Sequence, residues 1–206
     1  MIYIKFKRVL DIIFSLILLM MLLLPGVLIS LIVIFDIRDN PFFFQERVGK
    51  DTKVFKIYKF RTMREKYNEM GQLLSDEKRI TRIGGLLRKL SIDELPQIVN
   101  ILKGDMSFIG PRPLLVSYLS EYTKQQMQRH QLLPGLSGYA QVNGRNSISW
   151  TEKFNLDIYY VKNISFLLDL KILFLTLKRV IQQKDISERG YVTASKFVND
   201  GSRGSK

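Results

Sequence analysis

The chain has 206 residues, which is typical of one domain with a substantial core. It carries 32 Lys and Arg against 19 Asp and Glu, a net charge of +13, so its partners are expected to be anionic. The chain has no cysteine, which excludes disulfides and cysteine-based metal sites. Because the mean hydropathy is near zero in so basic a chain, the apolar residues must be concentrated in one region.

The apolar residues gather at the start of the chain. No charged residue occurs from Ile12 to Phe35, a run longer than the roughly 20 residues that cross a bilayer core. The run is also longer than the apolar part of a signal peptide, which has about 7–15 residues. Leu24-Pro25-Gly26 interrupts it, and a proline inside a helix removes a hydrogen bond and bends the helix. A kinked spanning helix and a re-entrant helix both remain open.

Basic residues flank this apolar run on both sides. Lys5, Lys7 and Arg8 precede it, and most of the Lys and Arg of the chain follow it, beginning with Arg38. Positive charge is retained on the cytoplasmic side, and a re-entrant helix would keep both flanks there. Long domains can be exported despite their charge, so the charge pattern does not decide between the two structures.

The rest of the chain predicts an α+β fold that is predominantly helical. Two short strands, 42–48 and 53–61, flank a Gly49-Lys50-Asp51 turn and predict a small β-hairpin. The expected helices span residues 62–74, 80–90, 91–103, 149–163 and 166–183. Residues 133–146 are rich in glycine and predict a loop. The helix at 166–183 is apolar with basic flanks, which suits either a membrane interface or packing on the domain core.

Asp93 and Glu94 are adjacent carboxylates at the expected start of the 91–103 helix. Ser91-Ile92-Asp93-Glu94 matches a capping box, with Ser91 as the N-cap and Glu94 at N3. Taken alone, the pair is explained by this structural role. A carboxylate anion can also attack phosphorus, and its neighbour could bind a divalent cation such as Mg²⁺. The two interpretations are compatible.

Several basic residues are candidates for binding phosphate. Arg112 stands between two prolines, and the stiff backbone would present a guanidinium that grips phosphate with two hydrogen bonds. The alternative is an ordinary proline-rich turn with a solvated arginine. The further cation candidates are Lys59, Arg61, Arg88 and Arg145. The single histidine, His130, lacks a partner motif and is expected to be structural or at the surface.

Taken together, five segments resemble the bacterial sugar transferase family, the monotopic phosphoglycosyl transferases. They are K-R-V-L-D at 7–11, F-K-I-Y-K-F-R-T-M at 55–63, L-S-I-D-E-L-P-Q at 90–97, L-K-G-D-M-S-F-I-G-P-R-P at 102–113 and P-G-L-S-G-Y-A-Q-V-N-G-R-N at 134–146. The resemblance extends to about residue 185, and the short chain is most similar to the minimal, PglC-like members.

The resemblance implies an activity and a role for each candidate residue. The family transfers a sugar 1-phosphate from a UDP-sugar to polyprenyl (undecaprenyl) phosphate and releases UMP, the first membrane step of glycoconjugate assembly. It implies Asp93 as the nucleophile of a covalent phosphosugar-aspartyl intermediate, Glu94 as the Mg²⁺ ligand and Arg112 as a phosphate-binding residue. Lys59, Arg88 and Arg145 are expected to add substrate contacts.

The resemblance also implies an architecture at a membrane. Residues 1–38 would form a re-entrant helix-break-helix, residues 39–185 a catalytic domain with interfacial amphipathic helices, and residues 186–206 a polar, partly disordered tail. The domain would lie on the cytoplasmic face of the bacterial inner membrane. The break in the family occurs at a Ser-Pro pair, whereas this chain has Leu24-Pro25, so we expect the break to be held differently. The expected partners are a UDP-sugar, polyprenyl phosphate and the phospholipid membrane, with no nucleic acid, and a homodimer is compatible with the sequence.

Two other functions fit parts of the same sequence. A non-catalytic module could bind anionic membranes through its basic residues and amphipathic helices. Such binding would weaken with salt and would not depend on Asp93. A nucleic-acid binder has less support, because the basic residues are scattered along the chain rather than arranged in a stripe. The sequence does not identify the sugar.

Overall fold

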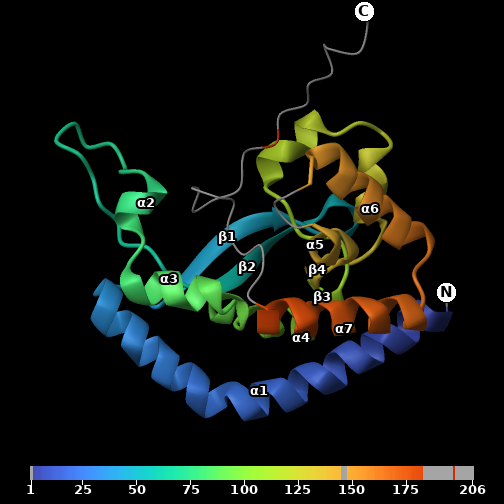
Figure 1. Cartoon of the computed structure of the whole chain (residues 1–206), viewed down its shortest axis with the longest axis horizontal. Helices are drawn as coiled ribbons and strands as arrows, with labels where there is room; N and C mark the ends of the chain where they lie inside the picture. Colours follow the sequence, from blue (N-terminus) through green and yellow to red (C-terminus); the bar gives the residue numbers. More distant parts are fainter. Residues whose placement is uncertain (1, 145–147, 183–196, 198–206) are drawn as a thin grey trace, which may run out of the picture.

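A computed structural model describes residues 2–144, 148–182 and 197 of the chain. Within these residues the fold is mostly helical with two small sheets, which confirms the predicted α+β class. Figure 1 shows the long helix α1 along one side of the molecule, with the other elements on its inner side. The candidate residue Arg145 lies outside the described residues, as does the expected tail at 186–206 apart from Phe197.

Helix α1 (Ile2–Ile37) runs without interruption through Pro25. The predicted helix-break-helix is therefore a single helix, and Figure 1 shows that it is bent, with its middle farthest from the other elements. Proline explains the bend, because its ring clashes with the preceding turn and it has no N–H to donate. The Ser30 hydroxyl donates a 2.7 Å hydrogen bond to the carbonyl of Gly26, a bond of the kind that also bends helices.

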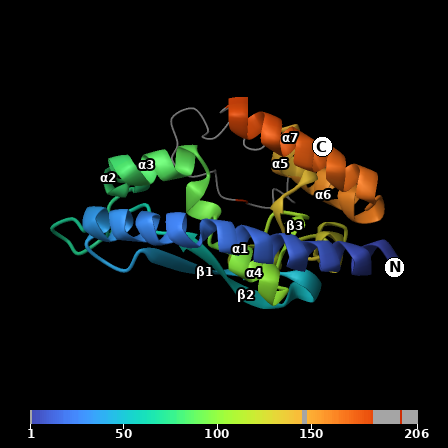
Figure 2. The ribbon, with the colours of Figure 1, turned by 90° about the horizontal axis from the view of Figure 1, so that it is seen from below.

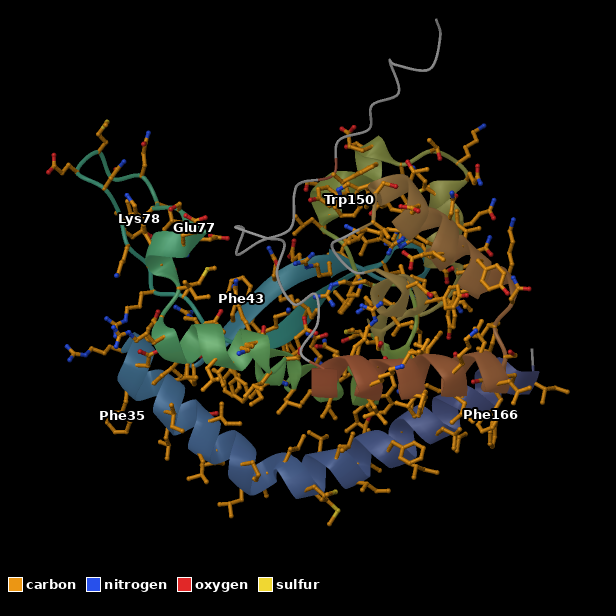
Figure 3. All side chains as sticks on the ribbon, in the orientation of Figure 1. Phe35, Phe43, Glu77, Lys78, Trp150 and Phe166 are labelled. Carbon is orange, nitrogen blue, oxygen red and sulfur yellow. The ribbon has the colours of Figure 1, made fainter. Side chains whose placement is uncertain are left out.

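The outer side of α1 is apolar and exposed. The helix is long and apolar enough to cross a membrane, and only 6% of its most apolar 18-residue stretch is buried. Met20, Leu23 and Leu24, next to the bend, keep 69–80% of their surface exposed. Figure 3 shows Phe35 pointing away from the domain. A helix in the core of a water-soluble domain would bury this surface.

Both ends of α1 contact the same domain. Near the N-terminus, the Arg8 guanidinium donates hydrogen bonds of 2.5 and 2.8 Å to two carbonyls at the end of α4 (Gln97–Lys103). Lys7 forms a 2.5 Å ion pair with Asp169. Near the C-terminus, α1 contributes to a buried cluster of Val33, Ile37, Phe60 and Leu87. The two ends are therefore held on one body, with the exposed bend between them.

Strands β1 (Phe42–Val48) and β2 (Val54–Phe60) form the predicted antiparallel hairpin. A 3-10 turn at Lys50–Thr52 connects them, and one face of the hairpin packs on α4 through a buried cluster that includes Ile57 and Ile101. The hairpin brings Lys59, near the end of β2, toward the start of α4.

The second sheet corrects one prediction. The expected loop at 133–146 contains strand β4 (Gly135–Ser137), which pairs in parallel with β3 (Ser107–Ile109), and helix α5 (Tyr139–Asn143). Glycine is typical of loops, but Gly135 instead permits close packing in the sheet. A Cβ at this position would lie 2.1 Å from the backbone nitrogen of Gly110.

The remaining helices agree with the sequence except at three places, the first being a short helix at Asp76–Arg79 that was not predicted. Their bounds are α2 (Asp76–Arg79), α3 (Arg82–Lys89), α6 (Trp150–Lys162) and α7 (Phe166–Gln182). The helix predicted at 62–74 is wrong, because the segment forms a turn in which the Asn68 side chain accepts hydrogen bonds from the N–H groups of Met70 and Gln72. The helix predicted at 91–103 begins only at Gln97.

Helix α7 packs on the domain with one side, as one of the two alternatives predicted, and its other side is apolar and exposed. Ile172 and Asp169 are buried against the domain. The opposite side exposes the large apolar residues Phe166, Leu167, Leu170, Leu173, Phe174 and Leu177. Figure 2, viewed from the α1 side, shows α3 and α7 along the same flank of α1. The start of α7 lies against that of α1, where the rings of Tyr3 and Phe166 are in edge contact.

Candidate active site

The adjacent carboxylates lie in a short turn between two helices. Asp93 and Glu94 belong to a 3-10 turn (Ile92–Glu94), and α4 begins only at Gln97. The predicted capping box is therefore wrong at this site: Ser91 is in the left-handed region with φ 56° and its side chain caps nothing. Pro96 explains the difference, since it cannot donate a backbone hydrogen bond and would clash with the carbonyl four residues earlier.

Two cations from distant parts of the chain meet the carboxylates. The Lys59 ammonium lies 2.7 Å from Glu94 Oε1 and 3.9 Å from Asp93 Oδ2. Arg112 donates a 2.8 Å hydrogen bond to the same oxygen of Glu94. Asp93 is 7% exposed. The structure thus brings together four of the predicted site residues: Lys59, Asp93, Glu94 and Arg112.

The surroundings shift the pKa values of the two carboxylates in opposite directions. Burial raises the pKa of Asp93, and the charge of Glu94 adds to this, while Lys59 opposes it. Burial would raise the pKa of Glu94 as well, but Arg112 and Lys59 together hold that pKa well below its usual range. Such a split is typical of paired acids with different roles. Glu94 is fixed as an anion, whereas Asp93 is the more basic carboxylate.

Arg88 approaches the site from α3. Its Nε donates a 2.9 Å hydrogen bond to the hydroxyl of Thr62, and its guanidinium is half-buried. Burial lowers the pKa of Arg88, and Asp93 is the nearby charge that opposes this most strongly. Arg88 is therefore a third cation near Asp93 and Glu94, the pair of carboxylates that we call the dyad. Arg61 does not, because it forms an ion pair with Asp39 instead.

Arg129 is a site residue that the sequence analysis missed. It is 3% exposed, and its Nη2 donates 2.7 Å hydrogen bonds to the carbonyl of Arg112 and to Asp157. This buried pair fixes the backbone of the Gly-Pro-Arg-Pro segment that presents Arg112. No sequence signal marked it, because Arg129 and Asp157 lie 28 residues apart in elements whose packing was unknown.

A groove leads from Glu94 to α7. It encloses about 200 Å³, and Glu94 and Arg112 line one part of it. The apolar side chains of Leu95, Phe108 and Leu173 line much of the remainder, and α7 also contributes Thr176 and Arg179. The groove therefore joins a charged site to a helix whose outer surface is apolar.

The described residues contain no group of three or more His, Cys, Asp and Glu that could hold a metal ion. Asp93 and Glu94 are the carboxylates available at the site. Mg²⁺ commonly uses one or two protein carboxylates and completes its shell with water and substrate phosphates. Both cations bind Oε1 of Glu94, and no described residue donates to its other carboxylate oxygen. The donor set thus fits Mg²⁺ bound together with a phosphate substrate.

The chain is similar to proteins of one known family. The model of the family described as bacterial sugar transferase matches residues 2–183. An uncharacterized sugar transferase, EpsL of Bacillus subtilis (strain 168), is 51% identical over 179 residues, which cover 84% of this chain and 89% of the relative.

Two further relatives have names that state a reaction. The UDP-N-acetylgalactosamine-undecaprenyl-phosphate N-acetylgalactosaminephosphotransferase of Aeromonas hydrophila is 43% identical over 68% of this chain and 35% of its own length. The undecaprenyl-phosphate glucose phosphotransferase of Komagataeibacter xylinus is 38% identical over 85% of this chain and 36% of its own length. The chain therefore spans about a third of the length of these two relatives.

Proposed function

Since the chain belongs to the bacterial sugar transferase family, we propose that it transfers a sugar 1-phosphate from a UDP-sugar to undecaprenyl phosphate and releases UMP. The observation that carries the proposal is the buried Asp93 carboxylate beside Lys59, at a site whose groove reaches an apolar helix. The names of two relatives, both undecaprenyl-phosphate sugar phosphotransferases, support the acceptor.

The chemistry proceeds in two exchanges at one phosphorus atom. An Asp93 oxygen attacks the sugar-bearing phosphorus, a P–O bond to Asp93 forms, and the bond to the UMP phosphate breaks. The electron pair of the broken bond stays on UMP. A phosphate oxygen of undecaprenyl phosphate then attacks the same phosphorus and displaces the Asp93 carboxylate. The products are the undecaprenyl diphosphate sugar, UMP and the unmodified enzyme.

Cations offset the repulsion between a carboxylate and an anionic substrate. Lys59 opposes the rise in the pKa of Asp93 that burial causes, and Arg112 presents its guanidinium from a loop whose backbone is held by Arg129. Arg88 adds a further positive charge near Asp93. Because these groups are already in place, little reorganisation is required as charge moves in the transition state.

We also propose that Glu94 holds a Mg²⁺ ion. Its low pKa keeps it anionic, and its second carboxylate oxygen is suited to a hard cation. When bound, Mg²⁺ would neutralise phosphate charge. Chelation with EDTA should then abolish UMP release, and added Mg²⁺ should restore it.

The membrane is expected to bring the lipid acceptor to this site. Both ends of α1 rest on the same domain while its bend is exposed and apolar, which supports a re-entrant helix. We place the domain on the cytoplasmic face, as the family resemblance implies. The exposed apolar residues of α7 suit the interface of the same membrane. An acceptor that lies in the bilayer could then reach Glu94 and Arg112 along the groove. This arrangement fits a minimal, PglC-like enzyme.

A panel of UDP-sugars tests the proposal. The protein, undecaprenyl phosphate and Mg²⁺ should release UMP with at least one UDP-sugar. Without acceptor, intact-protein mass spectrometry should detect a phosphosugar adduct that is absent from Asp93→Asn. Transfer that persists in Asp93→Asn would refute the nucleophile. Liposome binding that weakens with salt, with no UMP release from any UDP-sugar, would favour the non-catalytic membrane module.

A further inference from the structure

Arg47 is a basic residue beside the site, and it has no role in the reaction steps proposed above. It lies on β1, whose end runs along the segment after Arg112: the Val48 N–H donates a 3.1 Å hydrogen bond to the carbonyl of Leu114, and Arg47 pairs with Leu115 in a β-bridge. Its Nη1 lies 3.5 Å from the carbonyl of Pro113. The guanidinium is therefore held next to the loop that presents Arg112.

The Arg47 side chain has no anionic partner in the part of the chain that the structure describes. No carboxylate oxygen there lies within 4 Å of it, and its Nε is buried without a hydrogen-bond acceptor. Its Nη2 donates a 2.6 Å hydrogen bond to the Gln45 side chain, which fixes its orientation. Burial and the positive charge of Arg112 lower the pKa of Arg47 to about 10. A half-buried cation beside a like charge is a ready site for an anion.

The cations near Asp93 and Glu94 extend in a row toward Arg47. Lys59 and Arg112 both contact Glu94, and Arg47 follows beyond Arg112, whose positive charge adds to burial in lowering the pKa of Arg47. Arg112 contacts Glu94 at 2.8 Å, whereas Arg47 forms no ion pair with either carboxylate within the described residues, so Arg47 lies farther from the pair.

We propose that Arg47 binds the nucleotide-side phosphate of the UDP-sugar, an inference that rests on the proposed function. The sugar-bearing phosphate must lie within reach of Asp93, near Arg112. The second phosphate is one bridging oxygen away, and we assign it to Arg47, the half-buried guanidinium held beside the loop that presents Arg112. When the bridging P–O bond breaks, the electron pair remains on this phosphate, and the guanidinium fork stabilises the added negative charge as UMP departs.

The test compares inhibition by UMP and by uridine, which lacks the phosphate. In Arg47→Gln, inhibition by UMP should weaken about tenfold or more, because a hydrogen-bonded charge is lost, while inhibition by uridine stays unchanged. In Arg47→Lys, inhibition by UMP should be intermediate between that of the unsubstituted protein and that of Arg47→Gln, since lysine keeps the positive charge but cannot form two parallel hydrogen bonds. Lys56→Gln is the matched control, because Lys56 is exposed on the same hairpin.

The outcomes separate this inference from the proposed function. If the unsubstituted protein releases no UMP from any UDP-sugar, the proposed function fails. If it does release UMP, and a folded Arg47→Gln variant is inhibited by UMP as strongly as the parent, only the role of Arg47 fails. Equal weakening of UMP and uridine would show that Arg47 supports the loop structurally, which also overturns the inference. Thermal unfolding of each variant verifies that it is folded.

Discussion

Gly84 packs directly against the carbonyl of Thr62. A Cβ at position 84 would lie 2.0 Å from that oxygen, far inside van der Waals contact. The absent side chain lets α3 approach the segment after β2, where the Thr62 hydroxyl accepts a hydrogen bond from Arg88 on the same helix. The position of one cation near Asp93 therefore depends on a glycine that has no chemical role.

We predict that Gly84→Ala disrupts the site and that Gly85→Ala does not. The alanine at 84 meets backbone atoms that cannot move freely, which should cost about 1–3 kcal/mol and displace Arg88. A Cβ at Gly85 meets only the tip of Ile80 at 3.9 Å, so alanine there should be neutral or stabilise α3 by up to about 1 kcal/mol. Thermal unfolding and UMP release measure both effects. Equal behaviour of the two variants would contradict this account.

Removal of Lys59 should change how activity depends on pH. Burial raises the pKa of Asp93, and Lys59 is the charge that most opposes this shift. In Lys59→Met the pKa of Asp93 should rise further. The nucleophile must be ionised, so the acid limb of the kcat/KM profile should move to higher pH, in addition to an overall loss of activity.

Lys56→Met provides the control for this experiment. Lys56 is on the same strand but is exposed, and it makes no ion pair within the described residues. Its profile should match that of the unsubstituted protein. A Lys59→Met variant with uniformly lower activity and an unmoved acid limb would show that Lys59 does not govern the ionisation of Asp93.

The same sequence pattern gave a correct and an incorrect prediction. Ser149 and Glu152 form a complete capping box at the start of α6, as predicted. Ser91 and Glu94 have the same spacing, but Pro96 prevents one helix from running through the dyad. Pro96 lies two residues after Glu94 in the sequence, and its effect on the helix start outweighs the capping-box pattern. The result is chemically important, because both carboxylates are turned toward cations instead of capping a helix.

The residues around the dyad were predictable to different degrees. Arg112 is predicted from its flanking prolines and Lys59 is one of several cation candidates, and the structure brings both to Glu94. Arg129 and Arg47 contact backbone carbonyls of the Arg112 segment from elements distant in the sequence, and periodicity and turn patterns do not predict such contacts. The hairpin was predicted well because alternating residues and a turn specify it locally. The pairing of β3 with β4 depends on residues more than 20 positions apart.

His130 should make stability fall in mild acid. It is 5% exposed, its Nδ1–H donates to the carbonyl of Gly49, and burial, aided by Arg129, lowers its pKa to about 4. The unfolded chain has the ordinary value of about 6.5, so protonation favours unfolding. The stability is fully present above pH 6.5 and is lost as pH falls toward 4, by about 2 kcal/mol between pH 7.5 and 5.

His130→Asn tests this dependence. Asparagine keeps a donor for Gly49 but is a different shape, so the variant should be less stable at pH 7.5. Because asparagine cannot become charged, the variant should lose less stability than the unsubstituted protein between pH 7.5 and pH 5. Thermal midpoints at both values of pH give the comparison. If both proteins lose the same stability between these values, the acid sensitivity comes from other groups.

The path of α1 through the membrane can be measured because the chain has no cysteine. Single cysteines at Lys5 and Lys50, both exposed, report the N-terminal flank and the domain, and one at Leu24 reports the bend. For a re-entrant helix, a membrane-impermeant maleimide should label positions 5 and 50 from the same side, and position 24 should be protected. Labelling of 5 and 50 from opposite sides would establish a spanning helix.

Pro25→Ala should then redirect the helix. A straight helix of 36 residues is about 54 Å long, which exceeds the roughly 30 Å hydrocarbon core, so it would be able to cross. Crossing would separate Lys7 and Arg8 from their partners on the domain, and these contacts oppose it. We therefore expect a measurable fraction of position 5 to be labelled from the far side in Pro25→Ala. Gly26→Ala keeps the proline and meets no neighbouring atom, so it should retain the same-side pattern. An unchanged pattern in Pro25→Ala would show that the contacts at the two ends, rather than the proline, keep the helix re-entrant.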